Sequence, residues 1–412
     1  MKHTHSHQAA HVALLEPHRS DIERCVKCGS CRAVCPAFRQ GQEESQSARG
    51  RIALVQAVLD GRLNVSTIFR DRLATCAGCL ACEAACPSSV PVMKILQAAK
   101  ELAMAESGLG IVHRIISSVF KHPAAFRTTA WLVPLLLHYD DGQRCEGTKK
   151  GNHSKLRNHR SLESIGGFPG REGARGNVVF FPGCAINSFQ QDIGRAVISI
   201  LSRLGYHVRI PKGLRCCGRP LLSLGDRQAA KELASRNVSI ISAIKADAVV
   251  TACASCGLTF KKEYLTLLRP GEKMPAVVDI HEFLAGHLSL VSLRRIEKKV
   301  TYHDPCHLSR GQGLSGEARK ILRSIPGLVF EEMHDADRCC GFGGVMRMTH
   351  YALSDGIAAE KARNVIATGA SAVVTGCPSC CMQISHALKV AGSQIVVFHT
   401  AQVLRDALPE EP

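Results

Sequence analysis

The chain has 412 residues, of which 45% are hydrophobic, so it can bury a sizeable core, and its length suggests two or three domains. Its start is polar and has no apolar stretch of signal length, so we expect the 20 cysteines in a reducing compartment, the cytoplasm, and not in disulfides. Despite the formal net charge of +17, we do not expect nucleic acid as a partner, because basic residues are dispersed and aromatic residues are few.

The sequence contains no candidate membrane span. Crossing a bilayer takes roughly 18 to 20 apolar residues. The best run, residues 131–137, is short and is interrupted by Pro134. We therefore expect any membrane contact to be peripheral, at the inner face of the cytoplasmic membrane, or to be made through a partner.

Residues 1–20 contain five histidines without apolar periodicity, at positions 3, 5, 7, 11 and 18. We interpret this segment as a disordered, solvated tail in preference to a metal-loading site.

From residue 21 to residue 107, predicted helices alternate with two cysteine motifs. Residues 48–61 place apolar side chains on one face and end at a glycine, and residues 92–105 predict another helix. Both motifs have the spacing Cys-x2-Cys-x2-Cys-x3-Cys-Pro, which is typical of proteins that hold two [4Fe–4S] clusters. We therefore predict a small, mostly helical two-cluster ferredoxin domain.

The cysteines of the two motifs are expected to exchange one ligand. Three cysteines of one loop bind three corners of a cubane, and the fourth binds the other cluster. We therefore assign one cubane to Cys25, Cys28, Cys31 and Cys86, and the other to Cys76, Cys79, Cys82 and Cys35. Zinc is the alternative, but a zinc ribbon seldom provides a third cysteine at the same spacing and a fourth four residues later.

Residues 108–176 have a weaker pattern and predict a helical and basic linker. After two expected short amphipathic helices, residues 140–176 are rich in Gly, Lys, Arg, His and Ser, which is typical of an exposed connector. The basic stretch 149–155 could contact anionic lipid or an acidic partner, although a solvated connector is the preferred interpretation. Cys145 has no companion here and is interpreted as a free thiol.

Beyond residue 176, strands alternate with helices. Strands are expected at residues 178–181, 206–210, 248–251, 300–302 and 372–375, and helices at residues 188–204 and 226–246. Residues 278–281 resemble residues 396–399, with His281 matching His399. We predict two α/β units with mainly parallel sheets, at residues 177–290 and 291–412. The predicted fold class is α+β multidomain: a helical two-cluster ferredoxin followed by a duplicated α/β cysteine-rich unit.

Ten cysteines of these units form two copies of the pattern Cys…Cys-Cys-Gly…Cys-x2-Cys. They are Cys184, Cys216, Cys217, Cys253 and Cys256 in the first copy, and Cys306, Cys339, Cys340, Cys377 and Cys380 in the second. Each cysteine of the second copy lies 122 to 124 residues after its counterpart, so one unit was duplicated with its whole sulfur set.

Each cysteine group follows a strand, and most precede a helix. Open α/β folds form their sites at this position, beyond the carboxyl ends of the strands. The helix starts there also stabilise bound anions. Five thiolates per unit exceed the four that a tetrahedral zinc or an ordinary cubane requires. We predict that these units hold one or two further iron–sulfur clusters, which are either non-cubane or cubane. The fifth sulfur either bridges two irons or stays free for redox or substrate chemistry.

Other polar residues accompany the second copy. His303, Asp304 and His307 flank Cys306 and are candidates for a proton relay, although packing or hydrogen bonding to cluster sulfur is the preferred interpretation. Cys381 follows Cys380, and Gly257 is its counterpart in the first copy, so we interpret Cys381 as a spare thiol.

From Arg24 onwards, the chain resembles the iron–sulfur subunit of glycolate oxidase. The resemblance rests on residues 24–29, residues 48–52 with Gly61, residues 82–88 and both cysteine-rich units. It implies an electron-transfer subunit that works beside flavoprotein subunits, which oxidise glycolate to glyoxylate and alone carry flavin. Electrons would pass through the clusters to a membrane or quinone-linked acceptor.

The same cysteine-rich unit occurs in heterodisulfide reductase, in a subunit of anaerobic glycerol-3-phosphate dehydrogenase and in lactate-utilisation proteins, where it can hold a non-cubane cluster. Some glycolate oxidase subunits have eroded cysteine sets, whereas both sets are complete here. Disulfide chemistry, or a lactate or other 2-hydroxyacid substrate, therefore stays open.

We predict that this chain passes electrons from a reduced flavin on a partner 2-hydroxyacid dehydrogenase subunit and has no catalytic residue of its own. Residues 341–344 follow a cysteine pair and do not open a βαβ unit, so they form no dinucleotide fingerprint. The first alternative is a heterodisulfide reductase-like or lactate-utilisation subunit in which a cluster of a Cys-Cys-Gly unit performs the redox chemistry. The second is a zinc-bound structural or nucleic-acid-binding protein.

Overall fold

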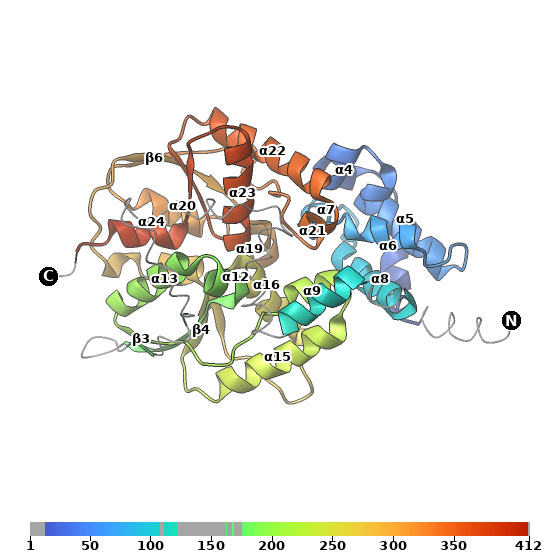
Figure 1. Ribbon diagram of the computed structural model, residues 1–412, viewed down its shortest axis with the longest axis horizontal. Helices are drawn as coiled ribbons and strands as arrows, with labels where there is room; N and C mark the ends of the chain where they lie inside the picture. Colours follow the sequence, from blue (N-terminus) through green and yellow to red (C-terminus); the bar gives the residue numbers. More distant parts are fainter. Residues whose placement is uncertain (1–12, 108–110, 122–161, 163–166, 169–174, 411–412) are drawn as a thin grey trace.

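The computed structural model describes residues 13–107, 111–121, 162, 167–168 and 175–410. A helical N-terminal module lies at one end, in blue and cyan, and contacts two α/β units, in green to yellow and in orange to red (Figure 1). The predicted α+β architecture, a helical ferredoxin module followed by two α/β units, is confirmed. Cys145, the basic stretch 149–155 and residues 131–137 lie outside the described residues.

The N-terminal module consists of short helices around one apolar core. Its helices are η1 (Glu16–His18), α2 (Arg19–Glu23), α3 (Ser30–Val34), α4 (Pro36–Gly41), η2 (Glu44–Gln46), α5 (Ala48–Leu59), α6 (Thr67–Ala74), α7 (Ala81–Ala84) and α8 (Val92–Ser107). The hydroxyl of Ser47 accepts a hydrogen bond from Gly50 N–H and caps α5, so this helix begins where the sequence predicted.

Part of the predicted N-terminal tail is folded. Leu15 is fully buried and packs with Ile22, Ile52 and Leu96 in the core of the N-terminal module. Burial of one leucine side chain removes apolar surface from water and orders the short helix beside it. Residues 13–20 therefore belong to the folded module, and the predicted tail boundary at residue 20 is wrong for them.

The first α/β unit contains a five-stranded sheet in the order β1-β3-β2-β4-β5. Its elements are β1 (Gly167–Phe168), β2 (Gly176–Phe181), α12 (Gly183–Ser188), α13 (Gln191–Arg203), β3 (Tyr206–Arg209), α14 (Arg219–Leu224), α15 (Arg227–Ser242), β4 (Ala248–Thr251), α16 (Ala254–Leu258), η5 (Thr259–Glu263), α17 (Tyr264–Leu267), β5 (Val277–Asp279), α18 (Ile280–Ala285) and η6 (Leu288–Leu290). All pairs in it are parallel except the β1–β3 pair.

Three described parts of the predicted linker pack in or on this unit. Leu162 is fully buried in its core, and its N–H donates a hydrogen bond to Asn187 Oδ1. Strand β1 pairs with β3. A helix, α9 (Ile111–Lys121), packs on α14 and α15 of the same unit. An exposed connector is therefore the wrong interpretation for residues 162 and 167–168.

The second α/β unit repeats the strand order without the extra edge strand, as β7-β6-β8-β9, and is entirely parallel. Its elements are β6 (Lys298–His303), α19 (Cys306–Gln312), α20 (Glu317–Arg323), β7 (Leu328–Glu331), α21 (Met346–Thr349), α22 (Tyr351–Ala367), β8 (Ala372–Thr375), α23 (Pro378–Val390), β9 (Val396–His399) and α24 (Thr400–Ala407). The two units are thus a structural duplication, as predicted.

The ends of the two units correspond differently from the sequence match. Asp279 is the last residue of β5, caps α18 and accepts a hydrogen bond from the N–H two residues later. His399 does the same for α24. His399 therefore corresponds to Asp279 in position, and its predicted match with His281 is out of register by two residues.

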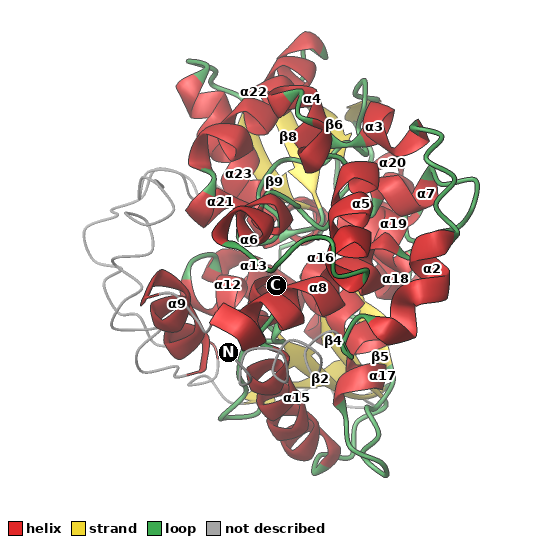
Figure 2. Ribbon diagram, turned by 90° about the vertical axis from the view of Figure 1, so that its right-hand side faces the viewer, coloured by secondary structure: helices red, strands yellow, loops and turns green. Residues whose placement is uncertain are grey.

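The two α/β units share one continuous apolar core and pack through α13 on α24 and through α18 on α20. A buried polar contact crosses the same boundary, where His281 Nε2 lies 2.9 Å from Thr400 Oγ1. Figure 2 shows the N-terminal helices in front of both sheets. All three modules are therefore in mutual contact.

Glycines permit the closest approach of the N-terminal module to the second α/β unit. A Cβ atom at Gly343 would lie 2.2 Å from the carbonyl oxygen of Ala77, and one at Gly344 would lie 2.8 Å from that of Cys76. Backbone atoms cannot rotate out of the way as side chains do. The loop between Cys340 and α21 therefore needs small residues where it meets the Cys76–Cys79 segment.

We expect Gly343→Ala to separate these two modules and to destabilise the holoprotein by about 1–3 kcal/mol, as overpacking does. The matched control is Gly316→Ala, because a Cβ at Gly316 meets no atom of the described residues within 4 Å. Anaerobic thermal unfolding and limited proteolysis of both variants measure the difference. Equal stability of the two variants would contradict the tight backbone contact.

Candidate metal centres

Cys25, Cys28, Cys31 and Cys86 line one pocket at the surface of the N-terminal module, together with Arg49. Cys28 is exposed. Its Sγ lies 3.4 Å from the hydroxyl of Ser30, and this hydrogen bond lowers the pKa of the Cys28 thiol. The structure thus brings together the four cysteines that the sequence assigned to the first cubane.

Left-handed backbone at two positions wraps the chain around this pocket. Lys27 has a φ of 56° and Gly29 a φ of 89°. Arg49 donates a hydrogen bond to the carbonyl oxygen of Lys27 at 2.9 Å, which holds the loop on α5. The Arg-Gly-Arg-Ile segment thus supports the cysteine loop directly.

Cys35, Cys76, Cys79 and Cys82 form a second group. Burial, reinforced by the other three thiols of the group, raises the pKa of Cys82 well above its ordinary value. Cys35 is buried, and desolvation raises its pKa, while the nearby Arg51 opposes the shift. This group is the one that the sequence assigned to the second cubane.

Two cations lie buried beside this second group. Arg51 is almost fully buried and donates hydrogen bonds to the carbonyl oxygen of Arg72 and to Thr75 Oγ1. Lys100 is also buried, and desolvation lowers its pKa to about 8, while the Cys76 thiolate opposes that shift. Burying positive charge is costly unless negative charge is close. Both residues suit a group of net negative charge held by the four thiolates.

The cysteines of both α/β units lie at the carboxyl ends of the parallel strands. Cys253 caps α16 directly after β4, and Cys377 caps α23 directly after β8. Eight of the ten thiols are buried, and Cys184 and Cys306 are partly buried. The topology therefore gathers segments far apart in the sequence at one end of each sheet.

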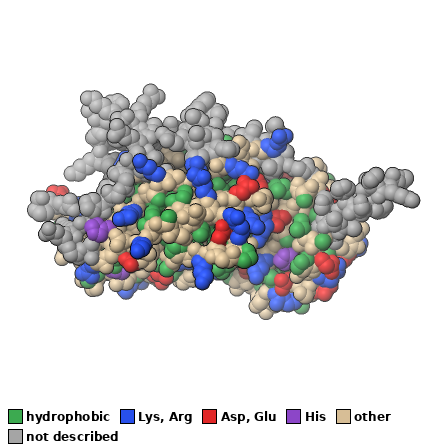
Figure 3. Space-filling model, turned by 90° about the horizontal axis from the view of Figure 1, so that it is seen from below, with side chains coloured by type: hydrophobic (Ala, Val, Ile, Leu, Met, Phe, Trp, Pro, Cys, Tyr) green, Lys and Arg blue, Asp and Glu red, His purple; other side chains and the backbone are tan. Residues whose placement is uncertain are grey.

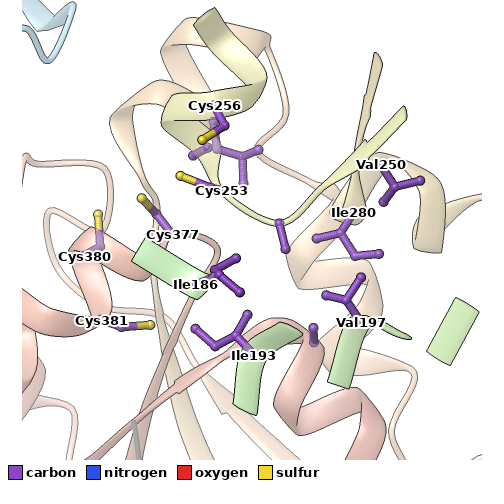
Figure 4. Packing of buried hydrophobic residues seen from close by; sticks show 14 of the residues in the cluster. Ile186, Ile193, Val197, Val250, Cys253, Cys256, Ile280, Cys377, Cys380 and Cys381 are labelled. Carbon is purple, nitrogen blue, oxygen red and sulfur yellow. The ribbon is translucent and has the colours of Figure 1, made fainter. Parts of the chain in front are cut away.

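Contacts between thiols connect the two copies. In the first copy, Cys216 is in hydrogen-bond contact with Cys184 and Cys217, and Cys217 with Cys256. In the second copy, Cys340 Sγ lies 3.5 Å from Cys380 Sγ. Cys253 of the first copy contacts Cys377 of the second, and Figure 4 shows their side chains pointing toward one another.

A further contact connects the second copy to the N-terminal module. Cys339 contacts Cys79, and this contact, together with burial, raises the pKa of the Cys79 thiol. Cys339 also contacts Cys306. Sequence analysis assigned these cysteines to separate sites and gave no signal that the sites adjoin.

His307 holds the three modules together. Its Nε2 lies 3.0 Å from the carbonyl oxygen of Gly78, which can only accept, so Nε2 carries the proton. Its Nδ1 then accepts a hydrogen bond from Ser255 Oγ at 2.9 Å. Burial lowers the pKa of His307 to about 4, so both bonds form in the neutral state at pH 7. His307 is thus anchored between backbone and hydroxyl groups.

The neighbours of His307 serve other purposes. Asp304 is buried and forms a two-bond ion pair with Arg319, with distances of 2.9 and 2.7 Å. This pair fixes the loop between β6 and α19. Cys381 is fully buried, and Figure 4 shows Cys380 and Cys381 pointing to different sides of α23. The position of Cys381 fits packing in the core.

Sequence reasoning missed Lys361, which lies on α22 with its side chain almost fully buried. Its Nζ donates hydrogen bonds to the carbonyl oxygens of Asp335 and Ala336. Burial lowers its pKa to about 8, and the thiolates of Cys340 and Cys339 oppose the shift. In the sequence, this lysine has the pattern of a solvated helix residue.

These surroundings fit iron–sulfur clusters. Burial and neighbouring thiols raise the pKa of Cys79, Cys82, Cys256 and Cys380, so their thiolates need a cation to replace water. Metal ions supply that charge and deprotonate coordinating thiols. Soft thiolate donors in sets of four or five suit iron–sulfur clusters, and the buried lysines and arginine balance the negative charge of such sites.

Two family models match the chain at these cysteine groups. The 4Fe-4S dicluster domain matches residues 21–90, and the cysteine-rich domain named CCG matches residues 178–261 and 300–385. Multiple iron–sulfur clusters are therefore the cofactors of this chain, as the sequence predicted.

Three curated relatives align over most of the chain. One subunit of the CoM/CoB fumarate reductase of Methanothermobacter marburgensis is 30% identical and aligns with 95% of this chain and 73% of its own length. The probable glycolate oxidase iron-sulfur subunit of Bacillus subtilis is 29% identical, with 94% of each chain covered. One subunit of the dihydromethanophenazine:CoB--CoM heterodisulfide reductase of Methanosarcina acetivorans is 26% identical, with 87% of each covered.

These relatives are all subunits of oxidoreductases, and the domain order of the chain is the one that its motifs predicted. The chain therefore belongs to the family of iron–sulfur oxidoreductase subunits in which a 4Fe-4S dicluster domain precedes two cysteine-rich domains, and it is a homologue of the glycolate oxidase iron–sulfur subunit.

Proposed function

We propose that this chain is the electron-transfer subunit of a flavin-dependent glycolate dehydrogenase, or of one for a related 2-hydroxyacid. It receives electrons from a reduced flavin on a partner subunit and delivers them toward a membrane or quinone-linked acceptor. The observation that carries this proposal is the contact between Cys79 and Cys339. It makes the cysteine groups of the N-terminal and C-terminal halves neighbours.

The cysteine groups form an unbroken series from the surface to the interior. The series begins at the surface pocket of Cys25, Cys28, Cys31 and Cys86 and continues through the buried group of Cys35, Cys76, Cys79 and Cys82. It passes from Cys79 to Cys339 and, through Cys377 and Cys253, to the first α/β unit. Clusters bound at these groups supply one-electron transfer. The protein positions and insulates them.

Glycolate oxidation requires a partner in this proposal. Conversion of glycolate to glyoxylate releases two electrons and two protons, which a flavin can accept together and pass on singly. Residues 341–344, the glycine-rich stretch, contact Ala77 and Cys76 and thus serve module packing. The flavin is therefore assigned to a partner flavoprotein subunit.

Protein partners at a membrane face are part of this proposal. Among the described residues, no helix has the length and apolarity that crossing a bilayer demands. On the face in Figure 3, Lys and Arg side chains lie scattered among apolar and acidic ones, unlike the basic stripe of nucleic-acid-binding proteins. We assign the complex to the cytoplasm, with peripheral contact at the inner face of the cytoplasmic membrane.

Because the two motifs exchange one ligand, we expect variants of two cysteines that bind the same cluster to have the same spectroscopic effect. Cys28→Ser and Cys86→Ser should alter the same cluster spectrum, and Cys35→Ser and Cys82→Ser should alter the other, because the structure groups them in this way. Loss of a cubane lowers iron by about four atoms per chain. Anaerobic iron and sulfide analysis with EPR spectroscopy of the reduced protein measures both effects.

Cys145→Ser is the control and should keep all iron, because Cys145 lies outside both motifs. If Cys35→Ser and Cys28→Ser altered the same cluster spectrum, the assignment would be contradicted.

Purification of the tagged chain from its native cells should retain a flavoprotein subunit. The complex should oxidise glycolate or a related 2-hydroxyacid and reduce a quinone analogue, whereas the chain alone should catalyse neither reaction. The measurement is substrate-dependent dye and quinone reduction, together with flavin per chain. Oxidation of glycolate by the flavin-free chain alone would refute this division of labour.

A second candidate function is reduction of a disulfide substrate, as in a heterodisulfide reductase, or a role like that of lactate-utilisation subunits. The favouring observation is that both cysteine sets are complete and meet at Cys253 and Cys377. Disulfide cleavage by the isolated chain after chemical reduction would support it. The glycolate proposal expects no such cleavage above that of a cluster-free preparation.

A further inference from the structure

His303 breaks the duplication inside the second α/β unit. It is the last residue of β6, and Phe181 is the last residue of β2, the corresponding strand. Both side chains are fully buried. Phe181 packs edge-to-face on Phe260, with ring centroids 4.6 Å apart. An imidazole at the same place carries two polar nitrogens into the core, which is costly unless both have partners.

Only one of the two nitrogens has a hydrogen-bond partner. Nδ1 lies 3.1 Å from the carbonyl oxygen of Ala336. A carbonyl can only accept, so Nδ1 carries the proton, and Nε2 of the neutral ring presents a lone pair. Nε2 is buried and has no hydrogen-bond partner among the described residues.

The lone pair lies beside two cysteine sulfurs. Nε2 of His303, Sγ of Cys340 and Sγ of Cys380 all lie within 4.8 Å of one another, and the two sulfurs are 3.5 Å apart. Two thiolates bound at about 2.3 Å to one tetrahedral metal are about 3.7 Å apart. The three atoms thus have the spacing of ligands to one metal ion. A lone pair facing thiolates without a metal between them would be repelled.

We propose that His303 Nε2 is an iron ligand in the second α/β unit and shares one iron with Cys340 and Cys380. This inference rests on the proposed function, which places a cluster in that unit. It gives the second unit a nitrogen donor where the first has phenylalanine. Because imidazole is neutral and thiolate is negative, replacing His303 by cysteine would lower the reduction potential of this cluster, the reverse of the change from cysteine to histidine in Rieske centres.

The test is pulsed EPR of the anaerobically purified full chain, grown with ¹⁵N-histidine and poised in the paramagnetic state of the second-unit cluster. We expect a nitrogen coupling strong enough for direct coordination, which changes with the isotope. His303→Phe, which installs the residue of the first unit, should abolish it. The matched control is Tyr302→Phe, because Tyr302 is also fully buried and its hydroxyl likewise lacks a hydrogen-bond partner among the described residues.

A second variant covers the case in which the His303→Phe protein fails to assemble the cluster. His303→Cys keeps a soft donor in place, so it should retain iron while losing the nitrogen coupling and lowering the potential. Weak nitrogen coupling in the unaltered chain, with normal iron, would overturn ligation and identify a hydrogen bond to cluster sulfur. Zinc in place of iron at this site would also overturn it.

Failure of the proposed function gives a different result. If Cys340→Ser left iron per chain unchanged, the second α/β unit would hold no cluster, and both proposals would fall together. If Cys340→Ser lowered iron while His303→Phe left the spectrum and potential unaltered, only the ligand assignment would fall.

Discussion

Burial of thiols is the constraint on which the rest of this structure depends. A thiolate taken out of water needs positive charge beside it, and most of the cysteines in the described chain are buried. The fold meets this need in two ways. It collects the sulfurs into sets that suit iron, and it places Arg51, Lys100 and Lys361 in the interior beside those sets. These cations have no comparable role in a protein whose core is apolar alone.

The duplicated architecture brings the cysteine groups of the two α/β units together. Parallel strands deliver each Cys-x2-Cys pair to the carboxyl end of its sheet, and the shared core turns these two ends toward each other. The N-terminal module then covers both ends, and His307 joins Gly78 to Ser255 at the meeting point. The same packing that stabilises the modules therefore fixes the spacing of the cysteine groups.

Much of the fold could be predicted from the sequence. Strands β4 and β8 have the predicted bounds, because buried parallel strands are continuous apolar runs flanked by turn residues. The helices α5 and α8 also begin where predicted. The cysteine sets could be read from spacing, because ligands of one site lie on short loops.

The contacts between modules could not be predicted. The approach of Cys79 to Cys339 depends on how two folded surfaces fit, which involves residues such as Gly343 that have no periodic pattern. Leu162 was missed because one apolar residue in a polar stretch is a weak signal, and Leu15 was missed because its apolar run, residues 12–15, is short, although both leucines are fully buried. The environment of His303 was missed because a buried lone pair is a property of the packed core.

The glycine contacts at Ala77 and Cys76 also bear on how the protein is made. Once this junction closes, the inner sulfurs lie behind folded backbone, where a scaffold protein that donates iron and sulfide cannot reach them. Maturation must therefore load the interior while the halves are still apart.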